Sequence, residues 1–309
     1  MYEFDLNKKN VLITGGGGFL AKFFAESILK FNGNPILIDY DSRGLNQNEA
    51  YLNKKTKKKI QKYLCDLTDE KKVSNLFSKL NKTLESYEVL INNAAPNPTI
   101  SKVIKTDNSL ENFSLNTWHN DINNGLTTAF LCTKYFLKSK DKKQENILNI
   151  SSDLGIIAPN QDLYRTRKKN FFKPITYSVM KHGIIGLTKY CSTYAIKKNV
   201  RCNAIALGGV KNNQPDIFIK KINKLIPLGR MARKDEYGAS IIYMISDRKE
   251  GSMGIIINKP ALNVSLENLL ENAKINIKNS TSTRPQIFYG GPMDLDKGFI
   301  FSYSILTTA

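Results

Sequence analysis

The chain has 309 residues, enough for one large α/β domain with an extension or for two domains of ordinary size. Hydrophobic residues make up 41% and charged residues 24%, values that allow a packed core and exclude wholesale disorder. The formal net charge is +19, from 46 Lys and Arg against 27 Asp and Glu. Most of these cations are lysines, and no recognisable nucleic-acid motif accompanies them. We therefore expect a solvated basic surface and no nucleic-acid partner.

Apolar strand-like runs alternate with helical patterns along most of the chain. In chain order we expect a strand at 11–13, a helix at 19–31, a strand at 35–39, a strand at 63–65, a turn and helix at 66–80, a strand at 89–91, a helix at 118–137, a strand at 147–150, a helix at 177–194 and a strand at 200–205. Strands separated by helices imply right-handed crossovers. The predicted fold class is therefore α/β, a Rossmann-type doubly wound parallel sheet flanked by helices.

The cysteines and the chain start indicate the compartment. Four cysteines lie in apolar stretches without CxxC spacing, which is typical of buried thiols in a reducing compartment: Cys65, Cys132, Cys191 and Cys202. With only two histidines, far apart in sequence, we expect no metal site. A polar start and the lack of 18 consecutive apolar residues favour a cytoplasmic protein without a membrane partner.

A glycine run marks a candidate nucleotide site. The sequence TGGGGFLA at 14–21 follows a strand and opens a helix, so its backbone can approach a pyrophosphate closely at a helix N-terminus. Asp39 ends the next strand, where a carboxylate can accept both ribose hydroxyls and repel a 2′-phosphate; it favours NAD over NADP. Asp66 and Leu67 are expected beside the adenine. The NAA turn at 93–95 follows the fourth strand at the ligand-binding edge of the sheet.

Five motifs occur in a fixed order: TGGGGFL at 14–20, NNAA at 92–95, NISS at 149–152, YSVMK at 177–181 and NAIALGGV at 203–210. Together they resemble the short-chain dehydrogenase/reductase family, over about residues 5–248. The resemblance implies that Tyr177 is the general acid/base, Ser152 holds the reacting oxygen, and Lys181 binds the nicotinamide ribose and lowers the pKa of Tyr177. It also places Gly208 and Val210 at the cofactor. The predicted cofactor contacts are Thr14, Gly15, Gly17, Gly18, Phe19, Leu20, Asp39, Asp66, Leu67, Asn93, Ala94, Ala95, Tyr177, Lys181, Gly208 and Val210.

The chain departs from the family pattern at the proton relay. Alignment on Trp118 puts Gly125 where the family carries a relaying Asn, with Asn124 one residue away. One residue rotates a helix position by about 100°, so Asn124 is no obvious substitute. The glycine spacing is closer to the epimerase/dehydratase branch of the same superfamily.

An insertion separates Ser152 from Tyr177 and includes QDLYRTRKKNFFKP at 161–174. Because both flanking residues are predicted to be catalytic, the insertion must lie beside the active-site mouth. Our hypothesis is that Arg165 and Arg167 bind an anionic substrate. The alternative is a surface loop or an oligomer contact.

After residue 249 a second resemblance begins. The motifs GSMGIIINKP at 251–260, YGGP at 289–292 and DKGFIFS at 296–302 resemble the YqgE/AlgH family. We therefore predict a dinucleotide-binding domain at 1–249 and a partial α+β segment at 250–309, from a natural or an artefactual fusion. The apolar stretch at 254–257 is a candidate seventh strand.

The combined reading is an NAD-dependent oxidoreductase that interconverts a hydroxyl and a carbonyl on a small sugar-like substrate, with an anionic group as a hypothesis. Two alternatives stay open: an NAD-retaining sugar epimerase or dehydratase, and a nucleotide-binding pseudoenzyme or scaffold. We expect a homodimer or homotetramer.

Overall fold

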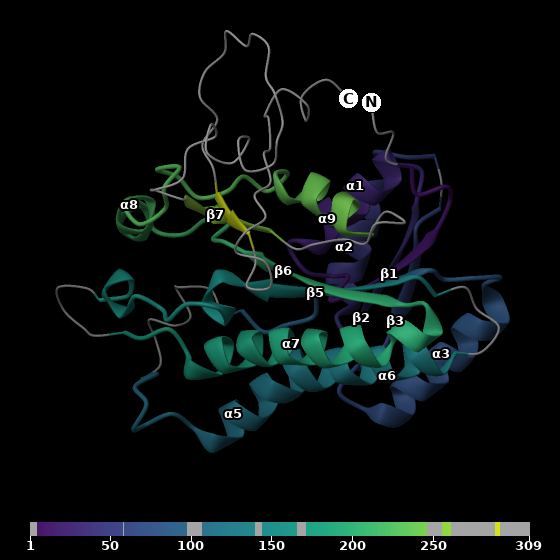
Figure 1. Ribbon diagram of the computed structural model, residues 1–309, viewed down its shortest axis with the longest axis horizontal. Coiled ribbons are helices and arrows are strands. Elements are labelled where there is room, and N and C mark those ends of the chain that lie inside the picture. The colour runs from purple at the N-terminus through teal and green to yellow at the C-terminus, as the bar shows by residue number, and fades with distance from the viewer. Residues whose placement is uncertain are drawn as a thin grey trace, which may run out of the picture.

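A six-stranded, wholly parallel sheet forms the centre of the molecule, with strand order β3-β2-β1-β4-β5-β6 (Figure 1). The computed structural model describes residues 5–57, 59–97, 107–139, 144–165, 171–245, 255–260 and 288–290. The strands of the central sheet are β1 (Asn10–Thr14), β2 (Asn34–Asp39), β3 (Gln61–Leu64), β4 (Val89–Asn92), β5 (Asn146–Ser152) and β6 (Arg201–Leu207). This is the doubly wound sheet that the alternating pattern predicts, so the predicted fold class is confirmed.

Helices cover both faces of this sheet, as parallel sheets require. They are α1 (Ala21–Lys30), α2 (Ser42–Asn53), α3 (Glu70–Thr83), α5 (Leu115–Ile122), α6 (Thr128–Lys138), α7 (Ile175–Tyr194), α8 (Asp216–Asn223) and α9 (Tyr237–Ile245). In Figure 1, α6 and α7 lie below the sheet, and α1 and α9 lie above it. The sequence pattern did not predict α2, which has few large apolar residues, or α8 and α9, which follow the last predicted strand.

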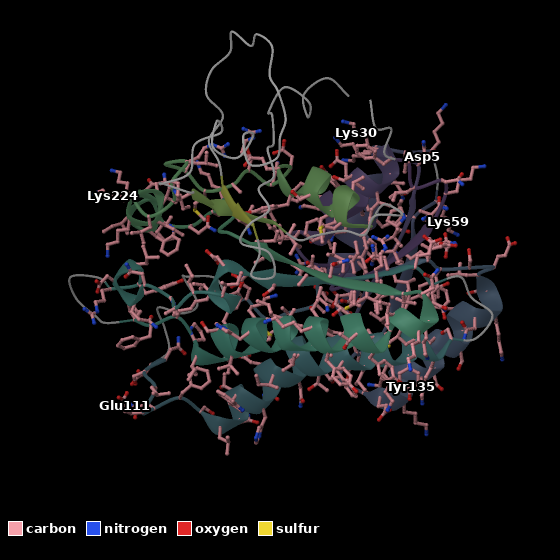
Figure 2. All side chains as sticks on the ribbon, in the orientation of Figure 1. Asp5, Lys30, Lys59, Glu111, Tyr135 and Lys224 are labelled. Atoms are coloured by element: carbon pink, nitrogen blue, oxygen red, sulfur yellow. The ribbon has the colours of Figure 1, made fainter. Side chains whose placement is uncertain are left out.

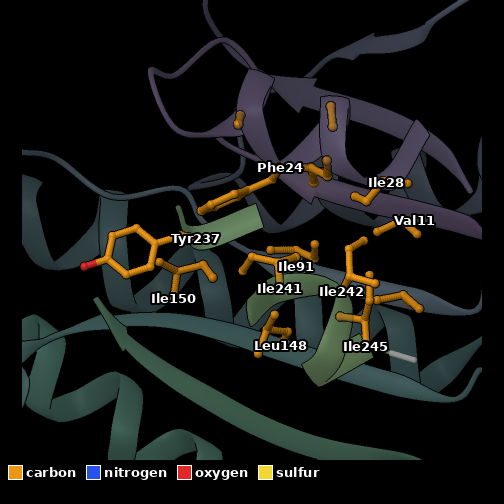
Figure 3. Close-up of a cluster of buried hydrophobic side chains, with 14 of the residues drawn as sticks. Val11, Phe24, Ile28, Ile91, Leu148, Ile150, Tyr237, Ile241, Ile242 and Ile245 are labelled. Carbon is orange, nitrogen blue, oxygen red and sulfur yellow. The ribbon is translucent and has the colours of Figure 1, made fainter. Parts of the chain in front are cut away.

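Alternation along the strands divides the hydrophobic core into two layers. In β1, the side chains of Val11 and Ile13 pack on one face with Phe24 of α1, whereas Leu12 packs on the other with Phe136 of α6. Figure 3 shows the first layer, where α9 covers the same face as α1. Because all three β1 residues are fully buried, the strand reads as a continuous apolar run.

The order of the strands places a crevice at the carboxyl edge of the sheet. From β1 the chain moves outward to β2 and β3 and then returns to the other side of β1 as β4. The loops that follow β1 and β4 therefore leave the edge in opposite directions. Ligands of open α/β sheets bind at such a switch point, and the Gly-rich loop lies there.

The helix expected at 118–137 is not continuous. Between α5 and α6 the backbone forms a wide π-helical turn, Asn123–Thr127, which the apolar spacing did not predict. The hydroxyl of Thr128 donates to the carbonyl oxygens of Asn124 and Gly125 at 3.0 and 3.1 Å, which satisfies acceptors in this turn. Single π-helical turns inside α-helices are frequent at functional sites.

The candidate seventh strand does not extend the central sheet. Strand β7 (Ile255–Pro260) pairs in antiparallel fashion with β8 (Phe288–Gly290) in a separate two-stranded sheet. The prediction that 254–257 would complete the main sheet is thus wrong, because the apolar stretch finds its hydrogen-bond partner in the C-terminal segment itself.

All four cysteines are free and buried, as their apolar surroundings predict. Within the described residues, no helix combines the length and the apolarity needed to cross a membrane.

Candidate active site

The Gly-rich loop fits between β2 and the turn after β4 only because its residues lack side chains. Gly15 has a positive φ of 65°, and a Cβ atom added there would lie 2.8 Å from Ala94 Cα. A Cβ atom at Gly16 would lie 2.7 Å from the backbone nitrogen of Ile38. These close approaches press the loop onto the sheet edge, where its backbone can line a dinucleotide.

The amino end of α1 completes an anion-binding geometry. No side chain caps this helix at Leu20, an arrangement that leaves its first N–H groups to a bound anion. The buried amide of Asn48, on α2, donates to the carbonyl oxygens of Gly16 at 2.7 Å and Gly18 at 3.0 Å. Asn48 thus holds the loop in shape, a role that the sequence did not reveal because Asn48 belongs to none of the motifs.

Asp39 lies at the carboxyl end of β2, against the Gly-rich loop. Its Oδ2 accepts a hydrogen bond from the Gly17 N–H at 2.9 Å, and its Oδ1 accepts from the Asp41 N–H at 3.0 Å. Each carboxylate oxygen has a second lone pair, so the group can still accept from ribose hydroxyls. The residues present therefore fit the adenosine half of a dinucleotide.

Thr14 joins the end of β1 to the turn after β4. Its hydroxyl oxygen accepts from the N–H groups of Asn93 at 3.0 Å and Ala94 at 3.1 Å, and the hydroxyl donates to Ile91 O at 3.3 Å. The amide of Asn93 donates back to Thr14 O at 3.1 Å. The structure thus brings the predicted residues of the two loops together at the crevice.

Asp66 is held in its own turn. One carboxylate oxygen accepts from the N–H and hydroxyl of Thr68 at 3.1 and 2.6 Å, and the other accepts from Lys72 at 3.2 Å. The Thr68 hydrogen bonds, with a further contribution from Lys72, hold the pKa of Asp66 below its usual value. Leu67 is buried in the core. This turn follows β3, the strand beside β2.

A cavity of about 460 Å³ separates Phe19 of the Gly-rich loop from the segment after β6. That segment contains Gly208 and Val210, and Val210 forms an isolated parallel bridge with Ala232. The cavity is lined by Phe19, Lys211, Asn212, Asn213, Gln214, Asp216, Ile219 and Lys234. Among the predicted cofactor residues, Phe19 lines this cavity, and Lys211 and Lys234 add cationic side chains to it.

The three predicted catalytic residues meet where β5 ends and α7 begins. Ser152 is the last residue of β5, and its hydroxyl donates to Asp153 Oδ1 at 2.7 Å. Tyr177, in the first turn of α7, is half-buried and forms a side-chain hydrogen bond with Ser152. Burial raises the pKa of Tyr177, and the Ser152 hydrogen bond opposes this rise.

Lys181 lies one turn further along α7, on the Tyr177 side of the helix. Its Nζ is buried, donates to Ile150 O at 2.7 Å, and lies 5.9 Å from the centroid of the Tyr177 ring. Burial, with a smaller contribution from the nearby Lys173 charge, lowers the pKa of Lys181 to about 8.

The structure adds a second ammonium to this site. Lys173, the residue before the N-cap of α7, places its Nζ 3.8 Å from the Tyr177 ring centroid and 3.2 Å from Asn97 Oδ1. Sequence analysis placed Lys173 in the basic insertion but did not single it out. The available signal was its spacing of four residues before Tyr177, which mirrors that of Lys181.

The contacts of the insertion arginines give less support for substrate binding than those of Lys173 do. Arg165 is exposed, and its guanidinium pairs with Asp162 at 2.9 Å. The ammonium of Lys221 on α8 donates to the carbonyl oxygens of Asp162 and Arg165 at 2.8 and 2.9 Å. Arg167 lies outside the described residues.

The Met180 side chain fills the space beside Gly125. Gly125 is buried, and a Cβ atom there would lie 1.6 Å from the sulfur of Met180, on α7. Asn124 turns its amide to Asn120 O at 2.7 Å and so binds the backbone of its own helix. As the helix rotation predicts, Asn124 does not take the place of the missing amide.

A buried polar network lies under the catalytic residues. The Asn92 amide donates to Asn149 Oδ1 at 2.8 Å and to the Thr133 hydroxyl at 3.0 Å. The Asn149 amide in turn donates to the Thr188 hydroxyl at 2.8 Å. The network ties β4 and β5 to α6 and α7, so it fixes the position of α7 on the sheet.

Comparison with known proteins agrees with this geometry. The sequence profile described as enoyl-(acyl carrier protein) reductase matches residues 20–258. The flagellin modification protein A of Campylobacter coli is 24% identical, over 79% of this chain and 94% of that protein. The 3-oxoacyl-[acyl-carrier-protein] reductase FabG of Buchnera aphidicola is 26% identical, over 79% of this chain and 92% of that protein.

Among solved structures, a short-chain dehydrogenase from Leptospira borgpetersenii with bound NAD⁺ is 25% identical, with a TM-score of 0.69. The match covers 84% of this chain and 94% of that one. A second profile, described as AlgH-like, matches residues 229–306, which agrees with the second resemblance. The glycine-rich crevice, the ordered motifs and the profile match over most of its length place this chain in the short-chain dehydrogenase/reductase family of oxidoreductases.

Proposed function

We propose that this protein is an NAD-dependent oxidoreductase that interconverts a hydroxyl and a carbonyl group on a small, anionic, sugar-like substrate. The observation that carries the proposal is the meeting of Ser152, Tyr177 and Lys181 at the carboxyl edge, beside the Gly-rich crevice. A hydroxyl, a phenol and an ammonium at one edge are the groups that acid–base chemistry on a carbonyl oxygen needs.

The residues have distinct tasks in this proposal. The hydroxyls of Ser152 and Tyr177 hold the reacting oxygen, and the Tyr177 hydroxyl donates its proton to that oxygen during reduction. Because burial raises the pKa of Tyr177, the phenol stays protonated and ready to act as an acid at neutral pH. In the reverse direction the ammonium of Lys181 favours the phenolate that removes the alcohol proton. When bound, a nicotinamide cofactor supplies or accepts the hydride.

The choice of NAD rests on Asp39. A carboxylate at this position accepts ribose hydroxyls and repels a 2′-phosphate; one of its oxygens binds the Gly-rich loop and the other binds the turn after β2. Related structures contain NAD or NADP, so the relatives leave this choice open. The predicted cofactor contacts stay part of the proposal.

Two alternatives have specific support. The glycine spacing favours an epimerase or dehydratase that retains its NAD; it would purify with bound cofactor and give no net NADH. The filled space at Gly125 favours a nucleotide-binding scaffold without turnover, because the Met180 side chain lies where the usual relay amide would begin.

The remaining predictions also stay proposals. Arg165 and Arg167 are proposed substrate contacts, although the guanidinium of Arg165 is engaged by Asp162. A domain boundary at 249 lies inside the overlap of the two matched ranges, 229–258. Free, buried cysteines support a reducing, cytoplasmic location. The expected homodimer or homotetramer awaits measurement of the mass in solution.

The test is NAD- and NADP-linked turnover against a panel of sugar phosphates, sugar acids and sugar nucleotides. Wild type should turn over at least one substrate with NAD preferred. Tyr177→Phe should lose about 10²–10⁴-fold in kcat, the usual contribution of a positioned acid–base group, and keep its affinity for NADH. Full activity of Tyr177→Phe would refute the mechanism. NADH binding without turnover would favour the scaffold.

A further inference from the structure

Lys173 is held in place by its backbone. Its N–H donates to Gln161 Oε1 at 2.9 Å, which ties the end of the insertion back to the short helical turn Gln161–Leu163. Phe171, two residues earlier, is buried, and Pro174 provides the N-cap of α7. The lysine side chain therefore projects from a fixed point.

The ammonium of Lys173 faces the proposed acid–base group. Its Nζ is closer to the Tyr177 ring centroid than the Nζ of Lys181 is, 3.8 against 5.9 Å. Since the phenol oxygen lies only half a ring and one C–O bond from that centroid, the ammonium lies within the length of a small substrate from the reacting oxygen. One of its three N–H donors binds Asn97 Oδ1, a neutral acceptor.

The charges around Tyr177 do not balance. Lys173 and Lys181 both act on this site, and they repel each other, because the Lys173 charge lowers the pKa of Lys181. The carboxylate of Asp153 acts on Lys173 in the opposite sense. Tyr164 and Tyr177 are neutral phenols whose pKa values burial raises. Among the described residues, the charged side chains that these contacts bring together are two lysines and one aspartate, with a net charge of one positive unit.

We propose that Lys173 binds an anionic group of the substrate, a carboxylate or a phosphate within a few bonds of the reacting carbon. The inference rests on the proposed oxidoreductase function and narrows its substrate to small hydroxy acids, oxo acids or their phosphorylated counterparts. A bound monoanion would neutralise the excess charge, and charge-assisted hydrogen bonds are the strongest that an ammonium makes. It assigns to Lys173 the role that the sequence suggested for Arg165, whose guanidinium already has a carboxylate partner.

A purely structural role is the competing explanation. The cation–π contact with Tyr177 and the hydrogen bond to Asn97 would also fasten the insertion to α7. Such a role would affect charged and neutral substrates equally, so paired substrates separate the two explanations.

The first experiment uses two substrate pairs that differ in charge: acetoacetate with ethyl acetoacetate, and dihydroxyacetone phosphate with dihydroxyacetone. Wild type should prefer the charged member of one pair, which identifies the anion as carboxylate or phosphate. Lys173→Met should lower kcat/KM for that member by about 10- to 100-fold, with less than about a 3-fold change for the neutral member. Lys173→Arg should restore much of the loss because it keeps the charge.

The matched control is Lys224→Met, at an exposed lysine at the end of α8 (Figure 2), which should behave as wild type. Equal losses on both members of a pair, or no preference for charge in wild type, would overturn the inference. Circular dichroism and Tm of each variant show whether it is folded, and Lys173→Gln provides a second uncharged variant.

A second measurement does not depend on turnover. Calorimetric titration with malonate and with inorganic phosphate, with and without NADH, should show one of the anions bound by wild type. Binding should be at least about 10-fold weaker to Lys173→Met. If wild type binds neither anion, or if Lys173→Met binds it equally well, the inference fails even where turnover is found. Loss of anion binding in Lys173→Met without any turnover would support the site and refute the oxidoreductase function.

Discussion

The carboxyl edge of the sheet has two parts: a nucleotide half around the Gly-rich loop and Asp39, and a catalytic half around Tyr177. Glycines determine the shape of the nucleotide half, whereas charged side chains dominate the catalytic half. In the first half, Gly15 and Gly16 lie so close to the neighbouring backbone that a single added carbon would collide with it. In the second, Lys173 and Lys181 surround a half-buried phenol. Substitutions should therefore act through shape in one half and through charge in the other.

The largest effect is expected in the nucleotide half. In Gly16→Ala, the new Cβ atom would lie 2.7 Å from Ile38 N and 2.8 Å from Leu37 Cβ, so the loop must leave the sheet edge. We expect the affinity for NADH to fall by about 100-fold, or roughly 3 kcal/mol, measured by fluorescence titration. The control is Gly186→Ala on α7, where nothing lies within 4 Å of the added atom and stability should rise slightly. If the NADH affinity of Gly16→Ala were unchanged, the assignment of the Gly-rich loop to the cofactor site would be wrong.

The next effect is steric, although it lies in the catalytic half. Gly125→Asn restores the residue type of the family but places its Cβ where the Met180 sulfur lies. Overpacking of this kind costs about 1–3 kcal/mol, so Tm should fall by several degrees without any gain in kcat. Adding Met180→Ala to Gly125→Asn should restore part of the lost stability, because the shorter side chain leaves space for the asparagine. If Gly125→Asn were as stable as wild type and more active, the side-chain amide would be the one group that the proton relay of wild type lacks.

The sequence predicted the nucleotide half better than the catalytic half, for a physical reason. A Gly run between a strand and a helix, with an acidic residue at the next strand end, is a local pattern, and the hydrogen bond from the Gly17 N–H to Asp39 brings these two parts together as that pattern suggests. The contact between Lys173 and Asn97 joins segments 76 residues apart, which no local pattern encodes. The motif order indicated Ser152 and Tyr177 because the chemistry itself restricts the residue types.

The sequence also did not predict the π-helical turn or the pairing partner of β7. Apolar spacing cannot distinguish one long helix from two helices joined by the π-helical turn at Asn123–Thr127, because apolar residues occur on both sides of the turn. The partner of β7 was likewise uncertain, because an apolar β-branched stretch pairs with whichever strand lies nearest.

A smaller effect is expected at Asp39, whose carboxylate both binds the Gly-rich loop and carries a negative charge. Asp39→Asn keeps an oxygen that can accept from the Gly17 N–H but removes the negative charge. We expect NAD affinity to fall by about 10-fold while NADP affinity stays equal or rises, because the 2′-phosphate is no longer repelled. Asp235→Asn, at an exposed carboxylate, serves as the control. If the preference between NAD and NADP did not change, Asp39 would not be a ribose contact.

The smallest effect is a pH dependence confined to the catalytic half. Burial lowers the pKa of Lys173 to about 8, with Asp153 opposing the shift, so its ammonium form is present below about pH 8 and is lost above it. For a site that needs this cation, kcat/KM for a charged substrate should fall about 4-fold between pH 7 and pH 8.5. Part of this fall should disappear in Lys173→Met. NADH affinity, set by loop geometry, should stay constant over the same range; a parallel fall in NADH affinity would mean that the two halves are not independent.

The same shift has a consequence for stability with a defined sign. The pKa values of Lys173 and Lys181 lie below the usual value of 10.5, so the unfolded chain binds more protons than the native chain between about pH 8 and 10.5. The free energy of unfolding should therefore gain a rising contribution from these two lysines across that window. At pH 7 both cations are retained against their burial cost, and Lys173→Met should relieve part of it. Because the cation–π contact with Tyr177 is lost at the same time, the net gain should be at most about 1 kcal/mol. Chemical denaturation of both proteins at pH 7 and pH 9.5 measures it: the advantage of Lys173→Met should be larger at pH 7, and an advantage that grows with pH would contradict a buried cation at this position.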